Sequence, residues 1–291
     1  MEKVNFYDEE IRCGYPVTAK TKRVWAIQLE MLDEVGRICK KYHIRYFADS
    51  GTLIGVIRHR GYIPWDDDID LVMMREDYDR FIEAASKEIK EPLFLQTVYT
   101  EKNYLKGHIQ IRNSNTTGYN AEDEKAGYHC GIFIDIFPLD GVPDAPWARK
   151  IWRFQVRTAW SVLYTWYRFG YYSGATAIGR ILHGIGEILR IPIPKAFKWY
   201  EKICARYSGK KTEYVCDTVF IADWEKNLWK REWFEKAVFM PFEDRQIPIP
   251  CGYDGRLKAE YGDYQKPVQA PACHGDLVLD PDISYKDFLN R

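Results

Sequence analysis

The chain has 291 residues, of which 46% are apolar and 29% are charged, and this composition excludes a globally disordered protein. The 42 basic and 42 acidic residues balance, so net charge alone gives no reason to expect a polyanionic partner. No apolar run approaches the ~20 residues of a membrane span, and the N-terminus lacks the apolar core of a signal peptide. Seven scattered cysteines without a Cys-x-x-Cys pair favour a reducing compartment, so we expect a cytoplasmic protein.

Hydrophobic spacing in the first third of the chain predicts helices that alternate with short strands. Val24, Ile27, Met31, Val35 and Ile38, for example, fall on one face of a helix. With glycine and proline as breaks, the expected elements are an irregular lead-in (1–19), a helix (20–43), a strand (45–48), a helix (52–59), a turn (61–64), a strand (69–73) that starts at three acids (66–68), and a helix (75–89).

The rest of the chain predicts strands first, then helices, then a mixture of both. The expected elements are strands at 94–98, 108–112, 116–119 and 132–137, two or three helices between 146 and 208, a hairpin of 237–242 with 246–249, a helix at 253–261, and a loop-rich tail after 267. We therefore expect an α/β (α+β) protein with a mixed sheet. Its parts would be a core at 20–144, a helical basic and aromatic subdomain at 145–212, and a C-terminal segment at 213–291 that packs back on the core and completes the site.

Acidic residues interrupt two of the predicted apolar strands. Asp68 and Asp70 flank Ile69, and alternate side chains of a strand point to one face, so their carboxylates are expected to project together. Asp135 interrupts another apolar strand and, on a neighbouring strand, would supply a third ligand. Oxygen ligands of this kind select Mg²⁺ or Mn²⁺. We therefore predict a site on these three acids for two such ions, of the kind that serves phosphoryl transfer.

A glycine turn precedes this acidic strand. The turn at Gly51 opens a helix whose first backbone N–H groups can bind phosphate, and Ser50 or Thr52 can add a hydroxyl. Strand, glycine turn, helix, acidic strand and later acidic strand is an order typical of the nucleotidyltransferase (polymerase-β-like) superfamily. An EF-hand is excluded, because its required Gly would fall on Leu71 and its final Glu on Asp77. A nucleotide-sugar glycosyltransferase is a rival, although its Asp-x-Asp normally closes an apolar strand.

Several blocks of the sequence resemble the LicD family, in family order, over about residues 24–275. The longest is residues 46–70, which read YFADSGTLIGVIRHRGYIPWDDDID, followed at 75–81 by REDYDRF. Residues 134–140, IDIFPLD, resemble the second block of the family. The C-terminal block is represented by Tyr253, residues 261–264, Pro267 and residues 274–275.

The resemblance implies a nucleotidyltransferase-like core at 20–144 and a phosphotransferase activity. Members transfer phosphocholine, or another phospho-alcohol such as phosphoribitol, from a CDP-linked donor such as CDP-choline. Bacterial members decorate teichoic acids, lipopolysaccharide or other surface glycans, and the fukutin-related proteins are distant relatives that transfer ribitol phosphate. The activity would release CMP and depend on Mg²⁺ bound to the acidic site.

We assign expected roles to the residues of these blocks. Asp68 and Asp70 would hold Mg²⁺ on the donor pyrophosphate, and Asp135 would complete the metal site and help to deprotonate the acceptor hydroxyl. The remaining candidates for substrate binding are Ser50, Gly51 and Thr52 at the donor phosphates, Arg58, His59 and Arg112 at the leaving CMP, Trp65 for stacking, and His274. One position departs from the family, because Gln110 stands where members often carry Lys, so the phosphate contact of that Lys is in doubt here.

The middle of the chain is basic and aromatic. Residues 145–212 carry 13 basic and 2 acidic residues, and residues 147–172 contain ten aromatic ones. Two interpretations stay open, a helical subdomain with an aromatic core and a solvated basic rim, or a surface for an anionic membrane or a lipid-linked acceptor. An aromatic box for a quaternary ammonium is a further option. No nucleic-acid-binding motif is present, so we expect no nucleic acid partner.

Three functions follow from these patterns. The first is a cytoplasmic phosphotransferase, at the inner face of the membrane if the basic region contacts lipid, with a glycan or lipid-linked glycan acceptor. The second is a nucleotidyltransferase or nucleotide-sugar glycosyltransferase on the same acidic site. The third is a catalytically inert, membrane-peripheral binding protein that keeps the fold.

Overall fold

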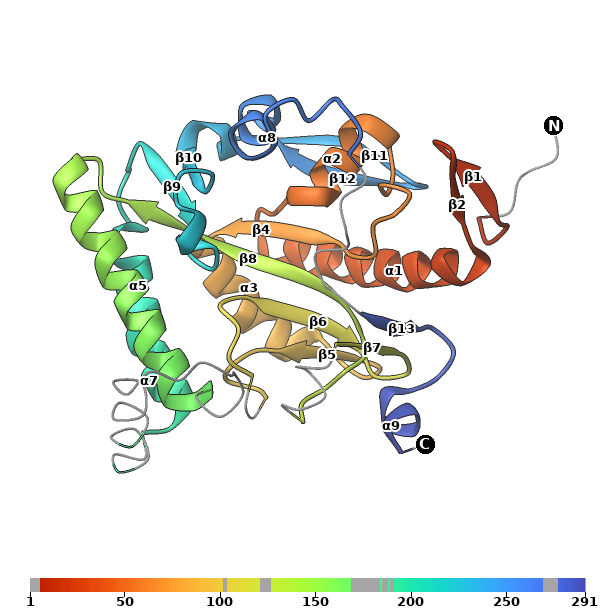
Figure 1. Cartoon of the computed structure of the whole chain (residues 1–291), viewed down its shortest axis with the longest axis horizontal. Coiled ribbons are helices and arrows are strands. Elements are labelled where there is room, and N and C mark those ends of the chain that lie inside the picture. Colours follow the sequence, from red (N-terminus) through yellow and green to blue (C-terminus); the bar gives the residue numbers. More distant parts are fainter. Residues whose placement is uncertain are drawn as a thin grey trace.

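The computed structural model describes residues 6–101, 104–120, 127–168, 191–268 and 277–290, together with Gly184 and Ile188. It confirms the predicted class, because a seven-stranded mixed sheet forms the centre and helices surround it (Figure 1). The strands of this sheet are β3 (Phe47–Ala48), β4 (Asp70–Met74), β5 (Leu93–Gln96), β6 (Ile109–Asn113), β8 (Ile132–Val142), β9 (Tyr214–Asp217) and β10 (Leu228–Lys230).

Strand β8 is the longest and connects both halves of the sheet. It pairs in parallel with β4 along one edge and antiparallel with β6 and then β9 along the other edge. Strands β3, β5 and β10 extend the sheet from β4, β6 and β9. All eleven residues of β8 are buried, as expected of a strand covered on both faces.

The two faces of the sheet have different roles. Ile132, Ile134 and Ile136 of β8 belong to the largest apolar cluster, which includes side chains of α1 (Ala19–Tyr42) and α3 (Arg75–Glu88). Because side chains of a strand alternate, Asp135 and Phe137 point to the opposite face. That face carries a second apolar cluster, with Phe137 and Leu139 of β8. The candidate acid Asp135 therefore lies on the face away from α1 and α3.

The main helices begin and end close to their predicted bounds. Helix α1 begins after Thr18, whose hydroxyl accepts a hydrogen bond of 3.1 Å from the backbone N–H of Thr21. It ends at His43, which takes the left-handed conformation with φ 54°. The other predicted helices and the hairpin are also present, as α2 (Ser50–His59), α3, α8 (Tyr253–Tyr261), β11 (Ala237–Phe242) and β12 (Arg245–Pro250).

One prediction about the termini was wrong, and several short elements were missed. The lead-in is not irregular, because β1 (Glu10–Arg12) and β2 (Tyr15–Val17) form a hairpin. The tail contains β13 (Val278–Asp280), which pairs with β7 (Thr117–Tyr119), and then α9 (Tyr285–Leu289). Strands β9 and β10 were not predicted at all. Each missed strand spans only three or four residues and so carries a weak pattern, although β7, also of three residues, was predicted.

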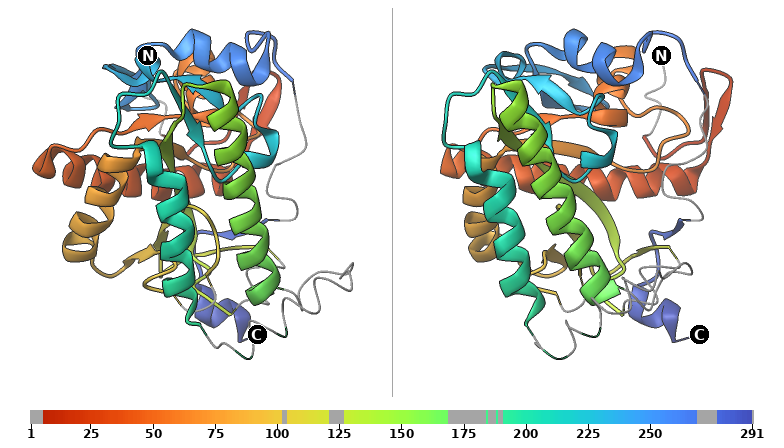
Figure 2. Two further views of the ribbon diagram at one scale, coloured as in Figure 1. Left: turned by 90° about the vertical axis from the view of Figure 1, so that its left-hand side faces the viewer. Right: turned by 60° about the vertical axis from the view of Figure 1, so that its left-hand side comes forward.

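The described part of the basic middle contains helices, as expected. Helices α5 (Pro146–Arg168) and α7 (Ile193–Cys204) lie side by side at one end of the molecule (Figure 2). Their shared core includes Trp152, which is 1% exposed and donates through Nε1 to the carbonyl of Ile203 at 2.9 Å. Short 3₁₀ helices follow at Ala205–Tyr207, Ile221–Asp223 and Arg231–Phe234. Within the described ranges, no helix combines the length and apolar character needed to cross a bilayer.

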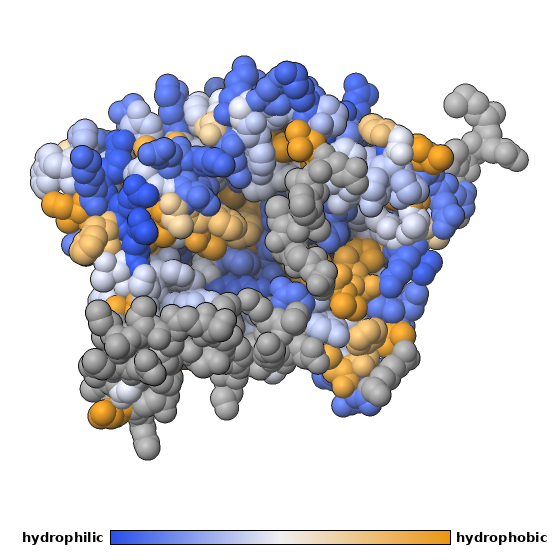
Figure 3. Space-filling model, in the orientation of Figure 1, coloured by the Kyte–Doolittle hydropathy of each residue, from blue (hydrophilic) through white to orange (hydrophobic). Residues whose placement is uncertain are grey.

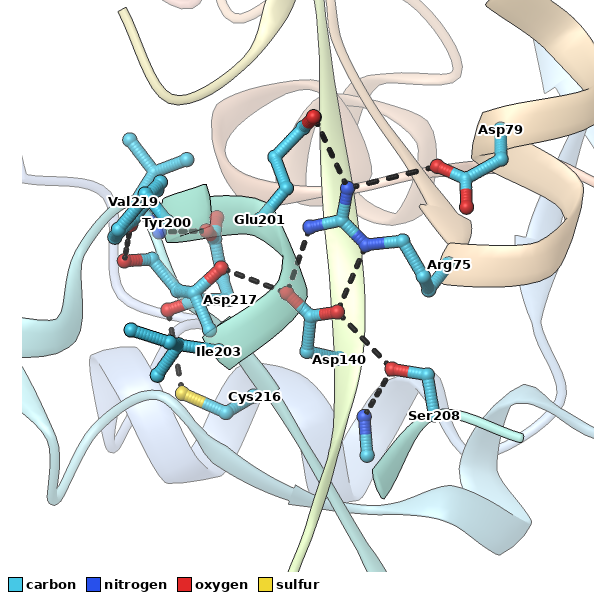
Figure 4. A network of polar contacts seen from close by, with 12 residues as sticks. Arg75, Asp79, Asp140, Tyr200, Glu201, Ile203, Ser208, Cys216, Asp217 and Val219 are labelled. Carbon is cyan, nitrogen blue, oxygen red and sulfur yellow. Dashed lines mark hydrogen bonds and ion pairs between the residues drawn. The ribbon is translucent and has the colours of Figure 1, made fainter. Parts of the chain in front are cut away.

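A buried ion pair joins α3, β8 and the residues around α7. The guanidinium of Arg75 donates two hydrogen bonds of 2.8 Å to the carboxylate of Asp140, which is fully buried (Figure 4). Ser208 and Thr218 donate their hydroxyls to the same carboxylate at 3.0 Å and 2.8 Å. Arg75 and Asp140 both lie in the family-like blocks, and this network gives them a structural role at the end of β8 opposite Asp135.

We expect Arg75→Leu to lower the free energy of unfolding by about 3–5 kcal/mol, because it leaves a buried carboxylate without its cation. Urea denaturation of the two proteins measures the difference. Arg37→Leu is the matched control, since Arg37 of α1 pairs with Glu88 of α3, and with Glu34 of its own helix, but its side chain is 46% exposed. Its loss is expected to cost about 1 kcal/mol or less. Equal effects of the two variants would contradict the structural importance of Asp140.

Candidate metal centre and active site

Three carboxylates converge at the start of β4. The parallel pairing of β4 with β8 puts Asp70 directly opposite Asp135. Asp68 joins them, and one carboxylate oxygen from each of the three residues lies within 4.8 Å of the others. Asp68 does not lie on the strand, although it was predicted to. Strand β4 begins only at Asp70, and Asp68 lies in the preceding loop. Its position therefore depends on how the loop is held and not on strand alternation.

The three acids share a buried and negatively charged environment. Asp68 and Asp135 are 6% and 3% exposed. Burial, and then repulsion from Asp68 and Asp135, raises the pKa of Asp70 well above its ordinary value. Two ionised carboxylates about 4 Å apart repel by about 4 kcal/mol at an effective dielectric constant of ~20. A divalent cation removes this repulsion, and the donor set of carboxylate oxygens fits Mg²⁺ or Mn²⁺.

Asp135 is oriented by residues of β6. Gln110 lies opposite Asp135 in the sheet and donates through Nε2 to its Oδ1 at 2.6 Å. His108 Nε2 lies 3.2 Å from the same oxygen. Gln110 therefore contacts the triad of acids directly at the position where the family often has Lys. This contact was not predicted, although the alternation of Gln110 with Arg112 along β6 is the signal that places both on the face of Asp135.

Arg112 is placed differently from its predicted substrate role. It is fully buried, and its guanidinium donates to the side-chain oxygens of Gln96 and Gln110 at 2.5 Å and 2.7 Å and to the carbonyls of Gly118 and Gly131 at 2.8 Å and 2.9 Å. A guanidinium occupied by protein oxygens on every side has no free edge for a phosphate. The contacts favour a role in which Arg112 fixes Gln110, which in turn fixes Asp135.

Helix α1 holds the loop that carries the acids. Trp25 donates through Nε1 to the carbonyl of Asp66 at 3.2 Å, and Gln28 donates through Nε2 to the carbonyl of Asp67 at 2.7 Å. Gln28 also accepts the hydroxyl of Tyr62, whose ring stacks on Trp25 with centroids 4.5 Å apart. Gln28 was not among the predicted residues, although a polar residue on the buried stripe of an amphipathic helix was a visible signal.

The glycine turn has the expected place but a different internal arrangement. Ser50, and not Gly51, takes the left-handed conformation, with φ 49°. Gly51 lies against Asp66, because a Cβ atom there would lie 2.5 Å from Oδ2 of Asp66 and would displace that side chain. The hydroxyl of Thr52 accepts a hydrogen bond of 2.9 Å from the backbone N–H of Asp70. The turn therefore borders the acid cluster, and the Asp66 carboxylate lies next to Gly51 at the start of α2.

A buried ion pair connects the C-terminal segment to the residue before the glycine turn. Arg256 of α8 donates to Oδ2 of Asp49 at 2.6 Å, and its guanidinium lies over the ring of Trp229, 3.5 Å from the ring centroid. The backbone N–H of Asp49 donates to the carbonyl of Asp70 at 3.0 Å. Burial raises the pKa of Asp49, and the Arg256 guanidinium opposes that change. Neither residue was predicted, and the pair links α8 to the first residue before the glycine turn.

The other predicted substrate residues lie farther from the triad. Arg58 and His59 are at the last turn of α2, about 10 Å along its axis from Gly51, and Arg58 donates to the carbonyl of Tyr264 at 3.1 Å. Trp65 is half-buried beside the acids, with an edge contact to Tyr15 at 5.9 Å between centroids. His274 lies outside the described residues. The structure thus brings together Asp68, Asp70, Asp135 and the turn at 50–52, but not Arg58 or His59.

Aromatic rings lead from the triad to the surface. Phe137 follows Asp135 on the same face of β8, and its ring lies 4.5 Å from that of His108 and 5.6 Å from that of Phe220, between centroids. Phe220 is 48% exposed. Figure 3 shows a hollow in the middle of this side of the molecule, with hydrophilic surface on its floor and apolar surface along the wall formed by the segment after β9. Phe220 belongs to that segment.

Comparison with known proteins identifies relatives that share this region. A family model described as LicD/FKTN/FKRP, nucleotidyltransferase domain, matches residues 43–160. The chain is 31% identical over 247 residues to the lipopolysaccharide cholinephosphotransferase LicD of Haemophilus influenzae, covering 82% of this chain and 88% of that protein. It is 33% identical over 82 residues to the ribitol 5-phosphate transferase FKRP of Homo sapiens, covering 23% of this chain and 16% of that protein. The matched family domain contains all three acids of the triad.

We expect Asp70→Asn to have opposite effects on the stability of the metal-free and the metal-bound protein. Without metal it should raise the melting temperature by about 2 °C or more, because one repelling carboxylate is removed. With Mn²⁺ it should abolish the increase in melting temperature that the ion gives the unchanged protein. Thermal unfolding with and without Mn²⁺ measures both effects.

The matched control for this experiment is Asp33→Asn, on the exposed pair of Asp33 with Arg245. It should leave the response to Mn²⁺ unchanged. An Asp70→Asn protein that responds to Mn²⁺ as strongly as the control would show that the ion binds elsewhere.

Proposed function

The chain belongs to the LicD family, and from this membership we propose that it transfers a phospho-alcohol from a CDP-linked donor to a cell-surface glycan or its precursor, with release of CMP. Phosphocholine is the favoured group, as in the name of the Haemophilus influenzae relative. A teichoic acid or lipopolysaccharide precursor is the proposed acceptor, and the cytoplasm the proposed location. The observation that carries the proposal is the convergence of Asp68, Asp70 and Asp135.

We propose that these three carboxylates hold Mg²⁺ or Mn²⁺, as two ions, which when bound neutralise charge on the donor phosphates. The protein's part is to keep the acids in place. Gln110 fixes the carboxylate of Asp135, and the hydroxyl of Thr52 fixes the backbone of Asp70. Such positioning supplies much of the catalysis in phosphoryl transfer.

In the proposed reaction the acceptor hydroxyl oxygen attacks the β-phosphorus of the donor and loses its proton to a base, for which Asp135 is the proposed group. The bond from that phosphorus to the oxygen shared with CMP breaks, and CMP leaves with the electron pair. Attack at the β-phosphorus separates this reaction from that of a nucleotidyltransferase, which transfers the nucleotide. The backbone groups of Gly51 and Thr52 border the acids and are the proposed contacts to donor phosphate, which requires the Asp66 carboxylate to share or leave the start of α2.

The aromatic rings beside the triad support choline as the alcohol of the donor. The rings of Phe137 and Phe220 continue from Asp135 toward solvent, and a quaternary ammonium is attracted both to aromatic faces and to nearby carboxylates. A polyol such as ribitol needs hydrogen-bond partners instead, which phenyl rings do not supply. We therefore propose that Phe220 contacts the trimethylammonium group.

Product analysis tests the proposed reaction. With CDP-choline, Mg²⁺ and a glycan acceptor, we expect release of CMP and, for Asp135→Asn, a fall in kcat on the order of 10²-fold or more. Asp33→Asn should keep normal turnover. Release of pyrophosphate from a nucleoside triphosphate would favour a nucleotidyltransferase. Release of a nucleoside diphosphate from a nucleotide sugar would favour a glycosyltransferase. No turnover with any donor would favour the inert binding protein.

Donor preference tests the role of Phe220. Phe220→Ala should raise the KM for CDP-choline about 3- to 30-fold, the range of a cation–π contact, and change the KM for CDP-ribitol less than about twofold. Phe239→Ala is the matched control, because Phe239 is 64% exposed on the β11–β12 hairpin. An equal change of KM for both donors would contradict contact with the ammonium group.

A further inference from the structure

The outward surface of α5 carries a stripe of large apolar side chains. Trp147, Ile151 and Phe154 are 70%, 51% and 70% exposed. Their spacing of four and three residues places them on one face of the helix. The opposite face carries Trp152, Val156 and the rest of the buried core shared with α7. The stripe is therefore apolar surface that the described fold leaves in contact with water.

Helix α7 adds a second stripe beside the first. Trp199 is 49% exposed, and Lys195, Lys198 and Lys202 are exposed around it. The two helices lie next to each other in front of the rest of the molecule in the left view of Figure 2. We call the combined surface the outer face; its apolar members are Trp147, Ile151, Phe154 and Trp199.

The exposed charges that helices α5 and α7 themselves carry have one sign. Its exposed basic residues are Lys150, Arg157, Lys195, Lys198, Lys202 and, just after α7, Arg206. Helix α5 contains no acidic residue, and α7 contains only Glu201. Glu201 does not offset the basic charge of the outer face, because its carboxylate accepts the hydroxyl of Tyr99 and lies 3.7 Å from the guanidinium of Arg75.

We propose that the outer face docks on an anionic lipid bilayer. Exposed tryptophan and phenylalanine side chains beside lysines are the composition of helices that lie in the membrane interface, where the rings enter the headgroup region and the ammonium groups meet anionic lipids. A single-stranded nucleic acid fits less well, because base stacking is used together with a basic groove, whereas this surface is formed by the outer sides of two helices.

Docking in this way leaves the hollow of Figure 3 open to solvent. The outer face lies at one end of the molecule, and the hollow opens on the side that faces the viewer in Figure 3. A bilayer against the outer face therefore stands beside the hollow and does not cover it. The proposal rests on α5 and α7 alone and holds whatever the donor of the reaction is.

Vesicle sedimentation of the full chain tests the proposal. We expect binding to phosphatidylcholine vesicles that contain phosphatidylglycerol, weaker binding at high salt, and little binding to phosphatidylcholine alone. Trp147→Ser combined with Phe154→Ser should weaken binding at least about tenfold. Lys198→Gln combined with Lys202→Gln should weaken it about 30-fold at low salt.

The matched control is Val238→Ser combined with Phe239→Ser, which removes apolar residues that are 41% and 64% exposed on the β11–β12 hairpin. This control should bind vesicles as the unchanged protein does. All the variants should keep the melting temperature of the unchanged protein, because the changed side chains are exposed. Equal binding to neutral and anionic vesicles, vesicle binding unaffected by the α5 and α7 changes, or retention on single-stranded RNA in place of vesicles would overturn the proposal.

Discussion

The parallel pairing of β4 with β8 is the constraint on which the candidate site depends. Its register puts Asp70 opposite Asp135, so two carboxylates are forced together on a buried face of the sheet. With Asp68 beside them, the arrangement is repulsive when all three are ionised. The sheet and its apolar clusters must hold the acids against this repulsion, and a divalent cation would convert it into attraction.

Contacts from four parts of the chain keep the acids in place. Gln110 of β6 binds Asp135, Thr52 of α2 binds the backbone of Asp70, and Gln28 of α1 binds the loop before Asp68. Arg256 of α8 reaches Asp49, next to the glycine turn. At the other end of β8, Asp140 joins α3 to the segments around α7. Strand β8 therefore connects the candidate site to the two helices of the proposed membrane surface.

Much of the fold and the centre of the site could be predicted from sequence, because long periodic segments and acids within apolar strands are strong local signals. Helix α1 and helix α8 lie within a residue or so of their predicted bounds. Strands β9 and β13 were missed because they form by pairing with β8 and β7, which lie far away along the chain, and their three or four residues add little local pattern. Arg112 shows a different limit, because a basic residue near a site has the same sequence signal whether it binds phosphate or, as the contacts favour, supports Gln110.

The proposed reaction depends on the binding of a divalent cation by Asp68, Asp70 and Asp135 together. An anomalous difference map from crystals of the protein soaked in Mn²⁺ tests this binding most directly. We expect a peak in contact with oxygens of all three carboxylates, beside the turn at Gly51. A map without a peak there, or with Mn²⁺ held by Asp66 and Asp67 away from Asp135, would contradict it.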